Sequence, residues 1–360
     1  MSAPAAGLLP LLLLILTASA QPVDNIDALF NWIRGLGGEV HAEVKVDSNG
    51  VRGLYATKAI ATMENIAAIP SAAIINAGSF LESFSVPTLT VLREWKDPHS
   101  RFKPYIDTWP GPDAVLNSCN MAAKYAPMWK NEHWEKTALE WDSFLLSLHN
   151  GSMNVDLEYT VKEVVGNQPV SLEDLRYACA ISSTRYVSTT RRKRLLMAPV
   201  FDLANHERDC DNMLSTYEGE DFLYFIAAKD LQPGDEICYS YGALRDDYAV
   251  AHYGFLPRLE DPPRLSLVDH RDFKPDVPYS HDEPPSEEPF VGTPEELRAE
   301  LQRLRSIRNH ITGTPDALPP QPRGQDPIYD LLKDLEARRL NAIDYEMARI
   351  EGLLRGKEEL

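Results

Sequence analysis

The chain has 360 residues, 44% of them hydrophobic and 25% charged, with a formal net charge of −18 and an isoelectric point near 4.9. This composition is typical of a globular protein with one large domain or two smaller ones. Because so acidic a surface repels phosphates, the charge argues against a nucleic-acid partner.

The first twenty residues, MSAPAAGLLPLLLLILTASA, carry no charged side chain and contain an apolar core at 8–16. Ala18-Ser19-Ala20 then fits the small-residue cleavage rule of secretory signal peptides. The apolar core is too short for a membrane span, which needs about 20 residues. We therefore predict a signal peptide at 1–20 and no membrane segment after its cleavage; the alternative is an uncleaved membrane anchor.

Short β-branched runs separated by turn residues occupy positions 40–76. Asn49-Gly50 lies between two of these runs and predicts a tight β-hairpin, because both residues tolerate a positive φ. The following segment, 80–197, is expected to be mostly helical with loops. Strands are expected again at 222–231 and 236–242, with Gln232-Pro233-Gly234-Asp235 as the turn between them.

The composition changes after Pro257, where proline-rich and acidic stretches predict an extended linker. Thr293, Pro294 and Glu296 then form the pattern of a capped helix start. Apolar residues repeat along one face of this helix and of a second helix that begins near 326. They are Leu297, Leu301, Leu304, Ile307 and Ile311 in the first, and Leu331, Leu335, Ile343, Met347, Ile350 and Leu354 in the second. We expect these apolar stripes to serve packing within the protein rather than partner binding.

Four motifs follow one another along the chain: GVRGLYATKAI at 50–60, PVFDLANH at 199–206, LQPGDEICYSYG at 231–242 and AHYGFLP at 251–257. Each is weak alone, but the four in this order resemble the SET domain of protein methyltransferases. The chain looks most like the branch that contains the Rubisco large-subunit lysine methyltransferase and the actin histidine methyltransferase.

The resemblance implies an α+β fold with short curved β-sheets and a pseudoknot. In this branch a helical insert splits the SET domain, and a helical substrate-binding domain follows it. The corresponding boundaries here are 21–257 for the SET domain, about 78–198 for its insert, and 258–360 for the linker and a small all-α C-terminal domain.

The resemblance also implies S-adenosyl-L-methionine as the cofactor. An amide such as Asn205 can give donors and an acceptor to the zwitterionic methionine end, and Arg185 can form a charge-assisted pair with its carboxylate. The glycine-rich hairpin would let the backbone approach the ligand closely. The residues that match cofactor-binding positions are Gly50, Arg52, Gly53, Arg185, Asp202, Asn205, His206, Tyr253, Gly254 and Phe255.

Tyr241 matches the catalytic tyrosine of the family, whose hydroxyl lies near the transferring methyl group. Methyl transfer from a sulfonium is an in-line displacement, which requires alignment of donor and acceptor and exclusion of water. Tyr239 and Tyr253 are expected along the substrate channel, although Tyr239 also suits an ordinary core position. The predicted acceptor is a lysine of a protein substrate. A protein histidine, or a SET-like binding module without activity, are the alternatives.

His206 and Cys210 are four residues apart and would suit half of a zinc site. Such a site needs two further ligands, and the sequence shows no second cluster of them. No Cys follows Cys238, whereas the zinc-binding branch of the family places closely spaced cysteines after its last strand. We therefore expect no metal, which also argues against a metal-dependent hydrolase.

The four cysteines allow one or two disulfides, whose pairing the sequence leaves open. The chain ends KEEL, which resembles an endoplasmic-reticulum retention signal, and Asn150-Gly151-Ser152 is a glycosylation sequon. Together with the signal peptide, these features predict residence in the lumen of the endoplasmic reticulum, with secretion as the alternative.

Overall fold

The computed structural model describes residues 23–47, 51–79, 84–152, 169–189, 194–208, 210, 212, 215–242, 244–268, 289–316 and 318–358. The predicted signal peptide at 1–20, Gly50 and the last two residues of the KEEL ending lie outside the described residues. Among the helices that are described, none has the length and apolar character needed to cross a membrane.

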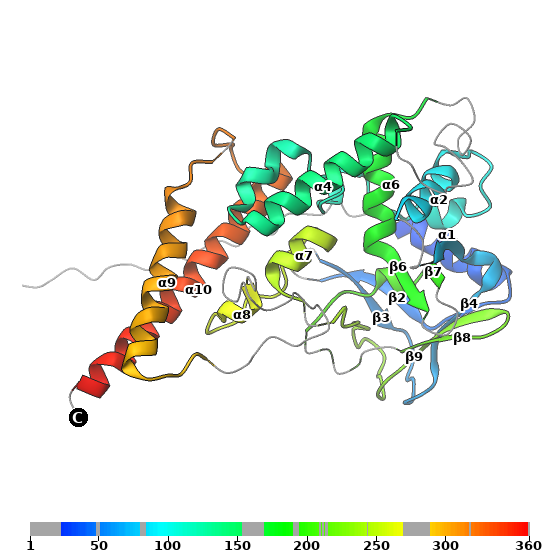
Figure 1. The fold of residues 1–360 in the computed structure, drawn as a ribbon. Coiled ribbons are helices and arrows are strands. Elements are labelled where there is room, and N and C mark those ends of the chain that lie inside the picture. The colour runs from blue at the N-terminus through cyan, green and yellow to red at the C-terminus, as the bar shows by residue number, and fades with distance from the viewer. Residues whose placement is uncertain are drawn as a thin grey trace, which may run out of the picture.

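Three small antiparallel sheets make up the β part of the described structure (Figure 1). The first has the order β1-β4-β9-β8: Glu39–Val40, Asn65–Pro70, Phe222–Ile226 and Ser215–Glu218. The second pairs β2, Ala42–Val46, with β3, Arg52–Ala56. The third has the order β5-β7-β6: Ile75–Ser79, Arg194–Met197 and Tyr186–Thr189.

The β2–β3 hairpin is the one that Asn49-Gly50 predicts. Val46 pairs with Arg52, and the Asp47 backbone N–H donates to the Val51 carbonyl over 2.8 Å, so the two strands pair as a hairpin, while Asn49 and Gly50 lie outside the described residues. This prediction is confirmed. The hairpin brings Arg52 and Gly53 to the start of β3 and therefore to the edge of the candidate site.

The segment 80–197 is predicted to be mostly helical with loops. Up to Arg185 its described residues form helices and turns, as predicted. They are α2, Ser85–Lys96; α3, Lys103–Ile106; α4, Glu132–His149; and α6, Leu172–Arg185, with 3-10 turns η2, Pro112–Ala114, and η3, Ala123–Trp129. The remainder, from 186 to 197, differs from the expectation because β6 and β7 pair there with β5. Leu195, Leu196 and Met197 are buried, and so short an apolar run has no period that separates strand from helix.

The predicted strand at 236–242 is an extended segment with isolated β-bridges rather than a continuous strand. Tyr55 bridges Glu236 on one neighbour, and His206 bridges Tyr239 in parallel on another. Two different partners thus share the segment, which prevents a long ladder with either. The preceding turn is confirmed: the Asp235 N–H donates to the Gln232 carbonyl over 3.0 Å.

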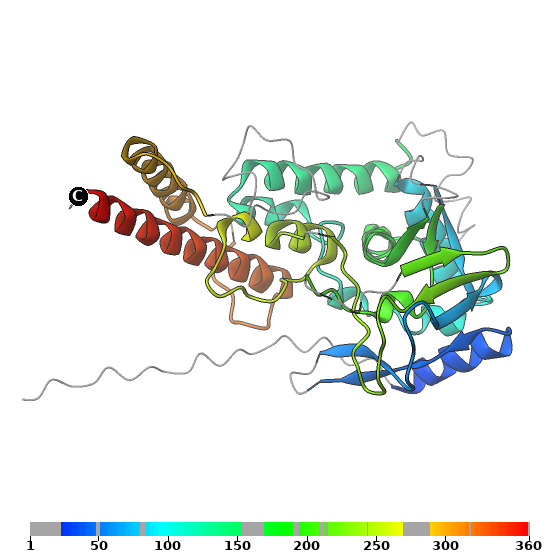
Figure 2. The ribbon, with the colours of Figure 1, turned by 90° about the horizontal axis from the view of Figure 1, so that it is seen from below.

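The C-terminal part is helical, as predicted. It contains α7, Asp246–Tyr253; α8, Leu265–Val268; α9, Pro294–Gly313; and α10, Pro327–Glu358. Thr293 and Glu296 form the predicted capping box at the start of α9. The apolar faces of α9 and α10 pack together around Leu304 and Ile343, both fully buried. Figure 2 shows the two helices side by side, extending away from the sheets.

Two further cores lie in the body of the molecule. The larger one lies between the sheets, α6 and α1, Val23–Gly35, and it includes the 3-10 turns η1, Ser71–Ala73, and η4, Phe201–Leu203. The smaller one joins the helical insert to α10 through Trp129, Trp134 and Leu332. Buried Arg339 of α10 donates to the Trp129 carbonyl within it. The C-terminal helices are therefore anchored on the insert and not only on each other.

Candidate functional site

The centre of the candidate site is where the segment 204–206 runs beside 239–241. The Tyr239 N–H donates to the Asn205 carbonyl over 2.8 Å. The Tyr241 N–H donates to His206 Nδ1 over 3.1 Å, and the Tyr241 hydroxyl donates to the Ala204 carbonyl over 3.0 Å. Residues from two distant motifs are thereby held in one register, and the predicted catalytic Tyr241 lies against the predicted cofactor pair Asn205-His206.

A disulfide fastens the same two segments. Cys210, four residues after His206, is joined to Cys238, with their Cα atoms 6.0 Å apart. The Cys210 sulfur is thus bonded to a second sulfur and is not a free thiolate for zinc. Within the described part of the chain, no three or more His, Cys, Asp or Glu side chains are grouped as a metal site.

Asn205 connects these segments to the β2–β3 hairpin. Its Nδ2 group donates to the Arg52 carbonyl over 2.7 Å and to the Glu236 carboxylate over 3.1 Å. A Cβ atom on Gly53 would lie 2.7 Å from that Glu236 carboxylate and 3.2 Å from Asn205 Nδ2, so a larger residue there would have to displace these two side chains. The arrangement turns the amide N–H groups toward the protein and leaves Oδ1 as the end that can accept from a ligand.

Arg185 and Asp202 form a buried ion pair on the other side of the site. Arg185 ends α6 and donates to Asp202 Oδ2 over 3.1 Å, and the Tyr105 hydroxyl donates to the same oxygen over 3.1 Å. Burial raises the pKa of Asp202, while Arg185 and then Arg52 oppose that rise. Burial lowers the pKa of the Arg52 guanidinium, and repulsion from Arg185 adds to the effect.

Aromatic rings surround Tyr241. Its ring centroid lies 5.6 Å from that of Tyr239 and 5.0 Å from that of Tyr253, which ends α7. Phe255 follows, 6.0 Å from the His206 ring. Burial raises the pKa of Tyr241 to about 12, so its phenol keeps its proton at neutral pH. Burial also raises the pKa of Tyr239 and of Tyr253.

His206 is a neutral ring in this setting. Burial, and then the charge of Arg208, lower its pKa to about 4. Because Nδ1 accepts from the Tyr241 N–H, the ring proton belongs on Nε2. His206 therefore supports the backbone that carries Tyr241, in addition to any contact with a ligand.

Three buried polar atoms next to Tyr241 have no hydrogen-bond partner among the described residues: Arg185 Nε, Asp202 Oδ1 and His206 Nε2. Two are donors and one is an acceptor. Buried polar atoms are normally paired in folded proteins, so this set fits a ligand that carries both positive and negative groups. The methionine end of S-adenosyl-L-methionine is such a ligand, and the residues present fit it.

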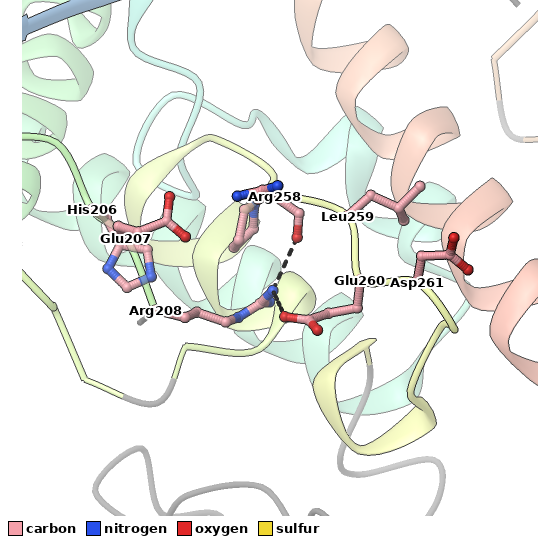
Figure 3. Close-up of a pocket in the computed structure, with 8 residues that line it drawn as sticks. His206, Glu207, Arg208, Arg258, Leu259, Glu260 and Asp261 are labelled. Atoms are coloured by element: carbon pink, nitrogen blue, oxygen red, sulfur yellow. Dashed lines mark hydrogen bonds and ion pairs between the residues drawn. The ribbon is translucent and has the colours of Figure 1, made fainter. Parts of the chain in front are cut away.

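A hollow of about 290 Å³ opens beside His206 (Figure 3). Its walls are mostly charged and come from two segments. They are His206, Glu207 and Arg208 from the first, and Pro257, Arg258, Leu259, Glu260 and Asp261 from the second. Figure 3 shows the Arg208 side chain reaching across to Glu260 and to the Arg258 carbonyl. Of the predicted site residues only His206 lines this hollow.

Gly254 has a different environment from its predicted neighbours. It caps α7 in the left-handed conformation, with φ of 77°. A Cβ there would lie 2.8 Å from the backbone of Leu116, so its observed role is close packing against the insert. A cofactor contact of Gly254 stays a prediction.

Tyr105 and Glu236 were missed by sequence reasoning, although both contact predicted site residues. Tyr105 is in the insert and belongs to no motif, so nothing local marks it. Glu236 lies inside GDEICYSYG. Its place in the motif that carries the predicted catalytic tyrosine could have indicated that it contacts the site.

The family model for the SET domain matches residues 51–242. Among solved structures, the SET domain of LSMT bound to lysine and AdoHcy superposes with a TM-score of 0.58 at 17% identity, covering 94% of this chain and 92% of that one. Rubisco LSMT bound to AdoMet superposes with a TM-score of 0.58 at 16% identity, covering 93% of each chain. No curated protein sequence matches the chain. The α+β SET fold and the resemblance carried by the four motifs are confirmed, and the chain belongs to the SET-domain family.

Proposed function

We propose that this protein is an S-adenosyl-L-methionine-dependent methyltransferase that acts on the side-chain nitrogen of a lysine in a protein substrate. The observation that carries the proposal is the set of three buried, unpartnered polar atoms beside Tyr241, in a chain of the SET-domain family. Two similar solved structures, Rubisco LSMT bound to AdoMet and the LSMT SET domain bound to lysine and AdoHcy, add support.

S-adenosyl-L-methionine supplies, when bound, a methyl group on a positively charged sulfur. The chain's own residues have the chemistry to hold its methionine end. Arg185 Nε would donate to the carboxylate, while Asp202 Oδ1 and Asn205 Oδ1 would accept from the ammonium group. Gly53 lets the Glu236 and Asn205 side chains approach the hairpin backbone closely, which helps to fix Asn205 at the site.

Tyr241 acts as a neutral hydroxyl. Its raised pKa of about 12 keeps the phenol protonated, and that proton is donated to the Ala204 carbonyl. The lone pairs of its oxygen are therefore the part that can face the reacting atoms. Tyr241 would orient the acceptor nitrogen and stabilise the charge that develops there; because its phenol stays protonated, it would not serve as the base that removes the acceptor's proton.

The rings of Tyr239, Tyr241 and Tyr253 favour lysine as the acceptor. An ammonium group is attracted to aromatic faces by roughly 0.5–2 kcal/mol, so such a wall attracts a lysine as it arrives. Burial between rings also lowers the pKa of an amine from about 10.4. The attraction to the rings favours binding of the charged lysine. The burial favours the neutral, reactive nitrogen that methyl transfer requires.

Calorimetric binding of S-adenosyl-L-methionine to the purified chain tests the cofactor assignment. We expect a Kd in the micromolar range for the wild type and a loss of at least roughly tenfold, or about 1.4 kcal/mol, in Asn205→Ala. Asn309→Ala, an exposed position on α9, is the matched control and should bind as the wild type does. A well-folded wild type that does not bind would refute the proposal.

The acceptor is tested with S-adenosyl-L-methionine labelled in its methyl group, incubated with a cell extract and the enzyme. Mass spectrometry of the labelled proteins should place the methyl group on lysine. Label on histidine would contradict the lysine assignment but would still support the assignment as a methyltransferase. Absence of label with a wild type that binds the cofactor would favour a binding module.

We also propose that the protein works in the secretory pathway, in the lumen of the endoplasmic reticulum. All four cysteines are paired, Cys119 with Cys179 and Cys210 with Cys238, and such bonds persist in oxidising compartments. Asn150 follows α4 with an exposed side chain that a glycan could occupy. Expression in a eukaryotic cell should give a glycosidase-sensitive shift in mobility that Asn150→Gln abolishes; free thiols and no shift would contradict this.

A further inference from the structure

A buried cluster of three charged side chains lies between the candidate site and the C-terminal helices. Asp246, at the start of α7, accepts from Arg208 over 2.8 Å and from Arg338 of α10 over 3.2 Å. Only 5% of the Asp246 side chain is exposed, against 11% for Arg208 and 20% for Arg338. We call Arg208, Asp246 and Arg338 the charged joint.

The joint also binds the backbone of the segments that form the site. Arg208, two residues after His206, donates to the Leu244 carbonyl over 3.0 Å and to the Arg258 carbonyl over 3.1 Å. Arg338 donates to the Pro257 carbonyl over 2.7 Å. The segment after Tyr241 and the segment after Phe255 are thus tied to His206 on one side and to α10 on the other.

Each charge in the joint compensates for the cost of burying the others. Burial raises the pKa of Asp246, and the two guanidinium groups oppose that rise, Arg338 foremost. Removing one guanidinium leaves a buried carboxylate with half of its compensation, an arrangement that is strongly destabilising locally. The chain can relieve it by moving α10, α7 or the 206–208 segment apart; α7 and the 206–208 segment carry Tyr253 and His206 of the site, and a movement of α10 releases the Pro257 carbonyl.

We propose that Arg338 is a positioning residue: through Asp246 and Arg208 it fixes the His206 and Phe255 segments, so that the docking of α10 sets the affinity for the cofactor. This inference rests on the proposed function for the identity of the ligand. The helices that follow the SET domain would then contribute to the cofactor site and not only to the binding of a substrate.

The test compares Arg338→Gln with Arg349→Gln in the full chain. Both positions are on α10 and both changes remove one positive charge, but Arg349 pairs with Glu346 and the Phe290 carbonyl, away from the joint. Calorimetry at a temperature well below unfolding should show Kd for S-adenosyl-L-methionine raised roughly tenfold in Arg338→Gln and unchanged in Arg349→Gln. Arg338→Lys, which keeps the charge, should recover part of the loss.

Hydrogen exchange of the same variants gives a readout that does not depend on the ligand. Amides of 204–208 and 253–258 should lose protection in Arg338→Gln and keep it in Arg349→Gln. Equal Kd and equal protection in the two variants would overturn the inference. If the wild type binds no cofactor, the proposed function fails. Separately, unchanged protection of 204–208 and 253–258 in Arg338→Gln would show that the charged joint does not hold these segments.

Discussion

Acidification should lower the free energy of unfolding, because His206 binds a proton more readily in the unfolded chain than in the folded one. In the unfolded chain its ring takes up a proton near pH 6.5, whereas burial, and then Arg208, lower its pKa in the folded chain to about 4. Between these values the unfolded state binds more protons, so the free energy of unfolding falls as the pH falls. The stabilisation is complete above about pH 6.5 and is lost progressively toward pH 4.

The gap between the two pKa values corresponds to roughly 3 kcal/mol, and because the ring is partly exposed we expect about 2 kcal/mol of it to be observed. Urea unfolding at about pH 7.5 and pH 5 measures the change in the wild type and in His206→Asn. The asparagine can offer Oδ1 to the Tyr241 N–H but does not titrate. Because pH 5 lies above the folded-state pKa of about 4, only part of this loss is reached, and the wild type should lose about 1 kcal/mol more than the variant on acidification; equal losses would refute the assignment of a buried, neutral His206.

Three further predictions concern other parts of the site. Replacing both Cys210 and Cys238 by serine opens a bond that spans 28 residues and should lower the free energy of unfolding in urea by about 3–4 kcal/mol; an unchanged midpoint would contradict this. Gly254→Ala, at a positive φ and against backbone atoms, should destabilise by about 2 kcal/mol or more, whereas Gly35→Ala, where nothing lies within 4 Å, should have almost no effect in the same thermal unfolding experiment. Tyr241→Phe should cost about 1 kcal/mol of stability and keep cofactor binding, while methyl transfer to protein in a labelled assay should fall by about 100-fold or more; retained activity would remove Tyr241 from the mechanism.

The features that could be predicted from the sequence are those whose cause lies within a few residues. Asn49-Gly50 specifies its hairpin because the turn conformation is local. Thr293 and Glu296 specify the start of α9 because the capping box is closed within one turn. The apolar stripes of α9 and α10 have the helical period, and this is why both helices and their packing faces could be predicted.

The features that could not be predicted depend on contacts between distant segments. The strands β6 and β7 become strands because β5 is there to pair with them. The two disulfide pairings, the Asp202 contact of Tyr105 and the charged joint likewise join residues far apart in the chain. No local pattern marks such residues, because the physical reason for each is a partner brought close only by the complete fold.

The unpartnered atoms beside Tyr241 point to a bound polar ligand more directly than the motifs do. Several motif residues have structural reasons to be what they are: Gly254 packs against the insert, His206 supports the Tyr241 backbone and Asn205 joins two segments. A SET-shaped binding module would need these residues for folding alone. It would not need buried polar atoms left without partners, each of which costs about 1–3 kcal/mol. Trp129, far from the site, also has a buried Nε1 without a partner among the described residues, so it is the grouping of three such atoms around one tyrosine that points to a polar ligand.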